Sequence, residues 1–305
     1  MKLSLGQVLA LSLAGLQFLA ILIVVSTSYL TSETAMLQHA RERLAEAGAN
    51  ASERSNAFLT PARETALLTK RLFESGNIDF ANVDELESFL FQNLLAKSQI
   101  AGIYYGDELG SFVYVMRSEG PAPFRTKIIH PAQSPRGAQL IWRNEDYSIT
   151  ANEIDPADTF DPRTRPWYES AKRDRATIWT EPYIFFSSRQ PGITVAVPIL
   201  ENGDFRGVIG VDIEIASISS FLSQLVLSER GSALILDAKG KVIAHPNMAQ
   251  IIANDAATAL NLVSIQDIND PVAQAAFTQL SKAGVIEIEQ AIESEFSYEN
   301  DKYVS

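Results

Sequence analysis

The chain has 305 residues, of which 46% are hydrophobic and 20% charged, a composition typical of a globular protein with one elongated module or two small domains. The formal net charge of -12 at pH 7, without a local cluster of lysine and arginine, excludes nucleic acid as a partner. The sequence contains no cysteine, which excludes disulfides, thiolate nucleophiles and cysteine-based metal sites.

The N-terminal segment is strongly apolar. No charged residue occurs between Lys2 and Glu33, and a helix of about 20 such residues crosses the hydrocarbon core of a bilayer. The sequence therefore predicts a cytoplasmic stub over residues 1–6 and a transmembrane helix over residues 7–30, with a cleaved signal peptide as the alternative. Because a basic residue precedes the span and acidic residues dominate after it, the rest of the chain is expected outside the cytoplasm.

Residues 31–76 are predicted to form one long helical stalk. Apolar residues recur seven apart from Leu37 to Phe58, which is typical of a helix that packs against a partner. The partner is either the protein's own sheet or a second copy of the chain, so a homodimer is expected without being fixed by the sequence. Thr60 and Pro61 suit an N-cap followed by proline at the first helical position, and we expect a kink or a restart there.

The pattern beyond Gly76 changes to short β-rich runs separated by turn residues, which indicates an antiparallel meander. The residues between the last two runs, Asn202 to Asp204, tolerate positive φ and predict a hairpin. Apolar residues from Ile215 to Val226 then recur at helical spacing and predict a connector helix that ends near Gly231. The predicted strands are Ile100–Tyr105, Gly110–Met116, Gln139–Arg143, Thr177–Phe186, Thr194–Leu200 and Gly207–Ile213.

A second, smaller lobe is predicted to open with a hairpin of residues 232–237 and 241–245. A helix over residues 271–283 and strands over 285–292 and 296–298 are expected to follow, with a further strand beginning as the sequence stops at Ser305. We expect a membrane-distal lobe over residues 77–228, an incomplete membrane-proximal lobe over 229–305, and a longer natural protein of which this chain is one part.

Four segments carry a resemblance to a known family. In chain order they are Asp161-Pro-Arg-Thr-Arg-Pro-Trp-Tyr168, Trp179-Thr-Glu-Pro-Tyr183, Gly192-Ile-Thr-Val-Ala-Val-Pro198 and Gly207-Val-Ile-Gly-Val-Asp212. This ordered set resembles the distal lobe of double Cache sensor domains, and the order of elements agrees over roughly residues 31–305. The resemblance implies an α+β fold of two stacked PAS-like lobes, each with an antiparallel sheet, along the long helix. Ligand binding is expected in the distal lobe.

Several residues of these segments suit a small zwitterion. Arg165 presents a planar fork of donors for a carboxylate, Asp212 accepts from an ammonium, and aromatic rings supply apolar walls with polar tips. In the amino-acid-binding subset of the family, the residues that match Arg165 and Trp167 hold the carboxylate, and those that match Tyr168, Tyr183 and Asp212 hold the amino group.

Phe160 departs from that subset, which has a tyrosine at this position; the ring is kept and the hydroxyl is lost. Three interpretations of the six residues stay open: an amino acid or amine ligand, another small polar ligand such as a carboxylate, or no small ligand. In the last case the motif only braces the sheet.

No catalytic or metal-binding pattern occurs, and no cofactor is expected. The three histidines, His39, His130 and His245, are far apart in sequence, and no nucleophile elbow or phosphate-binding loop is present. We therefore expect the sensor region of a receptor in a bacterial plasma membrane, which passes ligand binding to a cytoplasmic output domain.

The output domain is not identified by these residues. Arg125-Thr-Lys-Ile-Ile129 and Trp142-Arg143 resemble sensor regions of class III adenylate and guanylate cyclases, so a cyclase ranks ahead of a histidine kinase, a diguanylate cyclase or a chemotaxis domain. The alternative function is a stand-alone extracytoplasmic solute-binding protein.

Overall fold

The computed structural model describes residues 5–131, 137–225, 233–237, 239–247, 262–282, 295–298 and 301–304. The chain divides into two compact units, residues 51–287 and residues 1–50 with 288–305. The helices are α1 (Leu5–Glu74), α2 (Val83–Leu95), the 3₁₀ helix η1 (Pro162–Thr164), α3 (Pro166–Asp174), α4 (Ile215–Ser223) and α5 (Pro271–Lys282).

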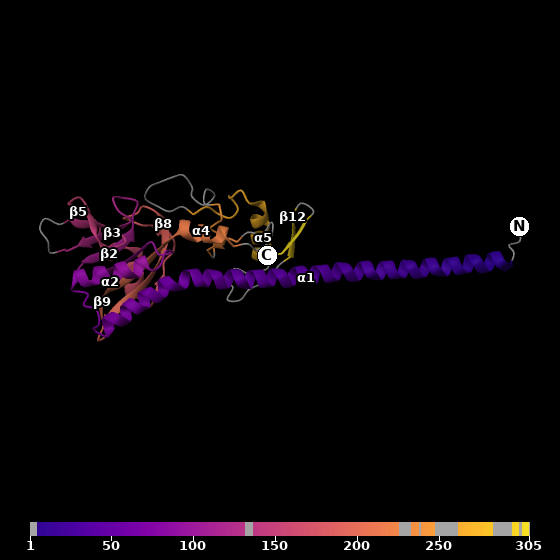
Figure 1. The fold of residues 1–305 in the computed structure, drawn as a ribbon, viewed down its shortest axis with the longest axis horizontal. Helices are drawn as coiled ribbons and strands as arrows, with labels where there is room; N and C mark the ends of the chain where they lie inside the picture. The colour runs from indigo at the N-terminus through magenta and orange to yellow at the C-terminus, as the bar shows by residue number, and fades with distance from the viewer. Residues whose placement is uncertain are drawn as a thin grey trace. The chain divides into compact units, whose positions relative to one another are not determined.

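The larger unit is built on an antiparallel sheet whose strands are hydrogen-bonded in the order β5-β4-β3-β2-β1-β9-β8-β6, with β7 also paired to β8. This arrangement confirms the predicted meander and the α+β class (Figure 1). The strands are β1 (Gly102–Asp107), β2 (Phe112–Arg117), β3 (Phe124–Ile129), β4 (Ala138–Arg143), β5 (Ile149–Asp155), β6 (Ile178–Trp179), β7 (Tyr183–Ile184), β8 (Pro191–Glu201) and β9 (Asp204–Glu214).

The two faces of this sheet bury different side chains because successive strand residues point to opposite sides. On one face Ile103 and Val115 join the core formed with α1 and α2. On the other face Tyr104 and Tyr114 pack with Trp167 and Tyr168 of α3. The predicted β8–β9 hairpin is confirmed, with both residues of its turn at positive φ, Asn202 at 53° and Gly203 at 89°.

Helix α1 runs through Pro61 as one helix, so the restart predicted at Thr60 is wrong, and the alternative, a kink there, stays a prediction. A proline inside a helix removes one backbone hydrogen bond. Here the following turns are held by the core, because Ala62, Ala66 and Thr69 are fully buried. The Thr65 hydroxyl also donates to the Pro61 carbonyl at 2.7 Å.

The predicted single strand Thr177–Phe186 is also wrong. The structure has two short strands, β6 and β7, and Pro182 between them has no N–H to donate to a neighbouring strand. Five elements were not predicted at all: α2, β3, β5, η1 and α3.

The smaller predicted lobe is described in part. Strands β10 (Ile235–Leu236) and β11 (Val242–Ala244) pair antiparallel, as predicted, and α5 matches the predicted helix closely. Side chains of Ile215, Val242, Ile265 and Ile268 form a separate small core. The connector helix α4 ends at Ser223, earlier than predicted. The boundary between the lobes near residue 228 and the predicted strand 285–292 lie outside the described residues.

The second unit contains the first part of α1 and a hairpin of β12 (Glu295–Tyr298) and β13 (Asp301–Val304), which confirms the strand predicted over residues 296–298. No helix in the described part of the chain is long and apolar enough to cross a membrane. The transmembrane helix predicted over residues 7–30 is thus not confirmed here and stays a prediction.

Candidate functional site

A small cavity lies on the face of the sheet that α3 covers. The space open to the centre of a water molecule is about 20 Å³, and about 10–15 Å³ of such space holds one water. Strands of the sheet, the segment before α3 and the segment after β7 supply its walls. The lining residues are Tyr104, Phe112, Tyr114, Phe160, Arg165, Trp167, Tyr183, Phe185, Phe186, Ser187 and Asp212.

The segment that carries Arg165 is fixed by its own turn. The Asp161 side chain caps η1 by accepting from the Arg163 N–H at 3.0 Å, and its carboxylate also pairs with the Arg163 guanidinium at 2.7 and 2.9 Å. Pro166 stands at the first position of α3, where its fixed φ favours the helix. Asp161 and Arg163 therefore brace the turn, while Arg165 and Trp167 line the cavity.

Arg165 reaches the cavity without an acidic partner within the described residues. One Nη donates to the Ile184 carbonyl at 3.3 Å. The guanidinium carbon lies 6.0, 5.8 and 5.9 Å from the ring centroids of Phe160, Tyr183 and Phe186. These rings favour a cation, and the remaining N–H groups are available to a ligand carboxylate.

Asp212 is the acidic group of the cavity, and only 3% of its surface is exposed. Its carboxylate accepts hydrogen bonds from Thr194 Oγ1 at 2.5 Å, from the Tyr104 hydroxyl at 2.8 Å and from the Tyr114 hydroxyl at 3.2 Å. Thr194 gives its only proton to Asp212, so the Tyr183 hydroxyl, 2.7 Å from Thr194 Oγ1, is the donor in that contact.

Burial raises the pKa of Asp212 to about 7, even though the three hydrogen bonds act in the opposite direction; the charge of Glu214 adds a smaller increase. Neutral hydroxyls stabilise a carboxylate less than a cation does. A carboxylate has about four acceptor positions, and three are used here. One position is thus left for a donor that enters the cavity, and a positively charged donor would lower this pKa.

Two glycines give the tyrosines their positions. A Cβ at Gly210 would lie 2.0 Å from Tyr104 Cε2, and a Cβ at Gly102 would lie 2.3 Å from Tyr114 Cε2. Any side chain at either position would displace the ring. The glycines of β1 and β9 therefore allow both hydroxyls to reach Asp212.

Comparison with known sequences decides the family. The chain matches the Cache domain family, in its double Cache form, over residues 28–303. The chain belongs to this family. Its fold agrees with the ligand-binding domain of the Campylobacter jejuni chemoreceptor Tlp3, solved in complex with 4-methylisoleucine, with a TM-score of 0.50, 15% identity and coverage of 86% of this chain and 82% of that one.

Two curated relatives show where such Cache domains occur. Adenylate cyclase 1 of Rhizobium meliloti is 26% identical over 275 residues, which cover 80% of this chain and 39% of the cyclase. The methyl-accepting chemotaxis protein PscA of Pseudomonas syringae is 38% identical over 99 residues, which cover 32% of this chain and 16% of PscA. The Cache domain thus spans well under half the length of these relatives, and it is the sensor region of a receptor.

Five of the six predicted site residues of this Cache domain line the cavity: Phe160, Arg165, Trp167, Tyr183 and Asp212. Tyr168 does not. Its hydroxyl donates to the Asp107 carbonyl at 3.0 Å, and its ring packs against Trp167 and Phe205. Its expected contact with an amino group therefore stays a prediction.

Sequence reasoning missed the partners of Asp212. Tyr104 and Tyr114 alternate with core residues in their strands, but only the pairing of β1 with both β2 and β9 brings them to Asp212. Phe112, Thr194 and the segment Phe185 to Ser187 were also missed. Among the described residues, no cluster of three or more His, Asp or Glu side chains is arranged to hold a metal.

Proposed function

We propose that this Cache domain is the extracytoplasmic part of a bacterial membrane receptor and that it binds a small amino acid between Arg165 and Asp212. The observation that carries the proposal is the pair of opposite charges that line one cavity without any ion-pair partner among the described residues. Arg165 would hold the carboxylate as a planar fork, and Asp212 would accept from the ammonium at its remaining position.

The rest of the cavity suits the apolar part of such a ligand. Trp167 and Phe160 are buried rings beside Arg165, and Tyr183 contributes a ring with a hydroxyl. Tlp3, which has the same fold, was solved with 4-methylisoleucine and with L-norvaline. Amino acids with apolar side chains are therefore the first compounds to test.

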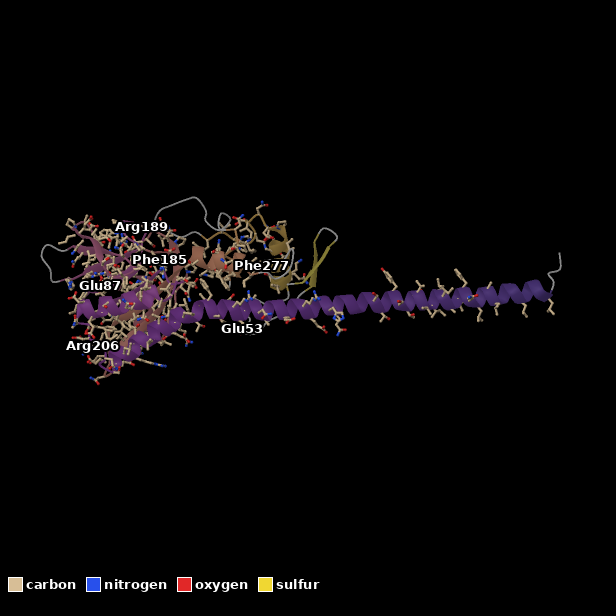
Figure 2. The ribbon with its side chains drawn as sticks, in the orientation of Figure 1. Glu53, Glu87, Phe185, Arg189, Arg206 and Phe277 are labelled. Atoms are coloured by element: carbon tan, nitrogen blue, oxygen red, sulfur yellow. The ribbon has the colours of Figure 1, made fainter. Side chains whose placement is uncertain are left out.

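Binding requires part of the wall to move, because the space for about one water cannot hold an amino acid. Most of the wall belongs to the sheet or to α3. Phe185, Phe186 and Ser187 belong instead to the turn between β7 and β8, and Arg189 in this turn has a strained positive φ of 59°. The Arg189 N–H donates to the Phe185 carbonyl at 3.0 Å across this turn. Both residues are labelled in Figure 2. The turn would open for entry, so the ligand would favour one conformation and could transmit a signal.

The test is a thermal-shift screen of the purified chain against amino acids, amines and carboxylates. A ligand at about 100 times its Kd stabilises a fold by about 2.7 kcal/mol. Arg165→Ala and Asp212→Ala should abolish the shift, while Arg173→Ala, which removes an exposed arginine of α3 that pairs with Asp174, should keep it. A shift that survives both cavity substitutions would refute the assignment.

Membrane attachment and output are further parts of the proposal. The apolar run over residues 7–30 would cross the membrane, with residues 77–228 as distal lobe and 229–305 as proximal lobe outside the cytoplasm. Large apolar side chains from Leu5 to Tyr29 are exposed on α1, which supports this assignment.

Because the alignment with the adenylate cyclase covers most of this chain, a cyclase is the first output to test. The stalk would form the seam of a homodimer.

A further inference from the structure

A second, larger cleft lies next to the amino-acid cavity on the same face of the sheet. Its volume is about 530 Å³, within the range of roughly 300–1,000 Å³ that is usual for small-ligand sites. Strands β2, β3 and β4 supply Met116, Arg125 and Trp142, the turn after β7 supplies Gln190, and β9 ends there with Glu214. Ser187 lines both spaces.

Two buried N–H groups in this cleft have no acceptor within the described residues, Trp142 Nε1 and Arg125 Nε. Only 8% of the Trp142 surface is exposed. One Nη of Arg125 donates to the Ser187 carbonyl at 3.2 Å and lies 3.2 Å from Met116 Sδ, which leaves its Nε unused. Buried donors are almost always paired in proteins. Two unpaired donors at one cleft therefore point to a ligand that brings an acceptor.

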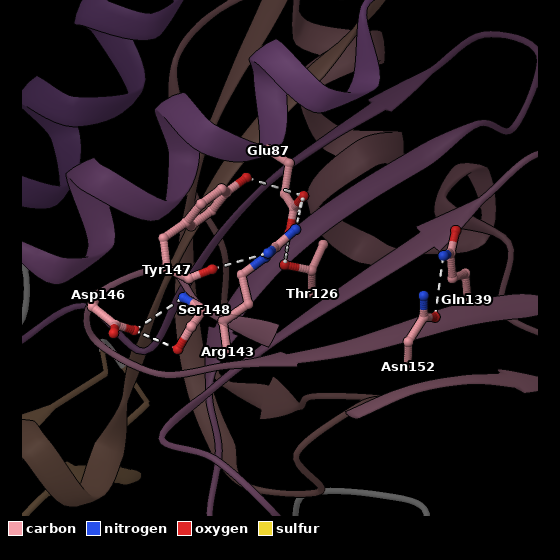
Figure 3. A network of polar contacts seen from close by, with 8 residues as sticks. All are labelled: Glu87, Thr126, Gln139, Arg143, Asp146, Tyr147, Ser148 and Asn152. Atoms are coloured by element: carbon pink, nitrogen blue, oxygen red, sulfur yellow. Dashed lines mark hydrogen bonds and ion pairs between the residues drawn. The ribbon is translucent and has the colours of Figure 1, made fainter. Parts of the chain in front are cut away.

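The strands that carry these two side chains are anchored to α2. Arg125 and Trp142 are cross-strand partners in β3 and β4, so they lie on one face of the sheet. The next residue of each strand faces the opposite side, and both of these residues bind Glu87 of α2. The Thr126 hydroxyl donates to this carboxylate at 2.5 Å and the Arg143 guanidinium at 2.8 Å (Figure 3).

The cleft also contains a negative end. Glu214 is half-buried there, and in the described part of the chain it makes no ion pair with Arg125. The other arginine of the cleft, Arg117, already donates to three backbone carbonyls at 2.9 to 3.1 Å. Arg125 is thus the available cation, and two carboxylates, Glu119 and Glu214, line the same cleft. Glu214 lies three strands from Arg125, a separation of at least about 14 Å between Cα atoms.

We propose that this cleft is a second binding site for a small zwitterion, whose carboxylate is held by Arg125 and Trp142 and whose ammonium is held by Glu214. The two charges suit opposite ends of one molecule. A dicarboxylate would bind less well, because Glu214 would repel its second carboxylate. This site does not depend on amino-acid binding between Arg165 and Asp212.

The experiment uses the full chain in detergent with Arg165→Ala and Asp212→Asn, which disable the first cavity. Three five-carbon probes differ only in their end groups: 5-aminopentanoate, glutarate and 1,5-diaminopentane. Calorimetry should show binding of 5-aminopentanoate in preference to the other two, and Arg125→Gln should weaken it about 10- to 100-fold. Arg173→Gln, which removes an exposed arginine paired with Asp174, should leave it unchanged.

A second experiment distinguishes the loss of the indole N–H from a loss of folding. Trp142→Phe keeps an aromatic ring and removes the donor, so it should weaken binding and abolish the ligand-induced change in tryptophan fluorescence. Trp179→Phe, at a partly exposed position outside the cleft, should change neither. The proposal is overturned if no probe binds, if glutarate binds equally well, or if Arg125→Gln and Trp142→Phe leave the affinity unchanged in folded protein. If the background variant with Arg165→Ala and Asp212→Asn no longer binds amino acids, that result tests the first cavity and not this cleft.

Discussion

Asp212 is a buried carboxylate whose partners are all neutral hydroxyls. Its three donors, Tyr104, Tyr114 and Thr194, satisfy most of its hydrogen-bonding capacity but bring no positive charge. A buried charge without a counter-ion is unfavourable, and the group responds by holding its proton up to higher pH. The site therefore keeps an acid near its midpoint at neutral pH, where an incoming ammonium has the largest effect on its ionisation.

The raised pKa predicts how stability depends on pH. The folded protein holds the Asp212 proton up to about pH 7, whereas the unfolded chain releases it near pH 4. Between these values the folded state binds more protons, so this group lowers the free energy of unfolding as pH rises from about 4 to 7. Asp212→Asn cannot titrate and should lose this decline, becoming more stable relative to wild type at pH 8 than at pH 5.

Urea unfolding at pH 5 and pH 8 measures the difference. Asp174→Asn removes an exposed carboxylate paired with Arg173 and serves as the control, because its pKa is lowered rather than raised. Equal pH dependence in wild type and Asp212→Asn would show that Asp212 ionises normally in the fold.

A buried ion pair supports the aromatic wall of the cavity. Lys127 pairs with Asp158, and its ammonium lies 4.6 and 4.9 Å from the ring centroids of Phe160 and Phe186. Burial lowers the pKa of Lys127, and the contact with Asp158 opposes that shift. Lys127→Met should lower the free energy of unfolding by about 3–5 kcal/mol, because it leaves the Asp158 charge without a partner.

A double-mutant cycle checks the cause. Lys127→Met with Asp158→Asn should recover part of the loss, since the double variant has no unpaired charge. Lys172→Met, on the exposed face of α3, should stay within about 0.5 kcal/mol of wild type. If the double variant is no more stable than Lys127→Met, the lost stability comes from packing and not from charge.

At the scale of elements, one carboxylate fastens α2 to the sheet. Glu87 accepts from Thr126, Arg143 and Tyr147, which belong to β3, β4 and the turn that follows β4 (Figure 3). Only 2% of its surface is exposed. Glu87→Gln leaves the Arg143 guanidinium buried without its counter-charge and should cost about 3 kcal/mol in chemical unfolding.

Glu85→Gln provides the matched control on the same helix, because glutamine preserves the capping contact with Asn82 and the residue is exposed. It should change the free energy of unfolding by less than about 0.5 kcal/mol. Similar losses in both variants would mean that the helix, and not the buried ion pair, is the sensitive feature.

These elements show where local pattern is informative. β1, β8 and β9 were predicted within a few residues because their apolar runs are bounded by turn residues. β5 was missed because it is an edge strand with mostly exposed residues. α2 was missed although Asn82, Glu85 and the apolar spacing of Leu86 and Leu90 give a recognisable start and face.

The site divides in the same way. Arg165 and Asp212 stand in segments that resemble a known family, so they could be named from the sequence. Tyr104 and Tyr114 could not be assigned, because their contact with Asp212 depends on the pairing of β1 with β9. Asp212 lies 108 residues from Tyr104 and 98 from Tyr114 in the chain. The register between distant strands depends on the tertiary fold, so a local sequence pattern does not predict it.

At the scale of the whole molecule, α1 joins two chemically different segments. Residues 51–74 include side chains that are fully buried in the core of the larger unit, such as Ala62 and Ala66. Residues 5–29 instead carry exposed Leu, Ile, Val and Phe side chains. An exposed apolar surface is unfavourable in water, which supports the proposal that this segment lies in a bilayer.

Membrane integration can therefore be tested by charge. Leu19→Arg with Leu22→Arg places two cations in the proposed span, each at a cost of about 2.5–3.5 kcal/mol at a helix centre. The wild-type chain should stay in the membrane pellet after alkaline carbonate extraction, and the double variant should move to the supernatant. Leu109→Arg, at a position that is 70% exposed in the larger unit, should stay in the pellet. Release of the wild-type chain by carbonate would show that α1 does not cross the bilayer, and the signal would then have to leave the sensor by another route.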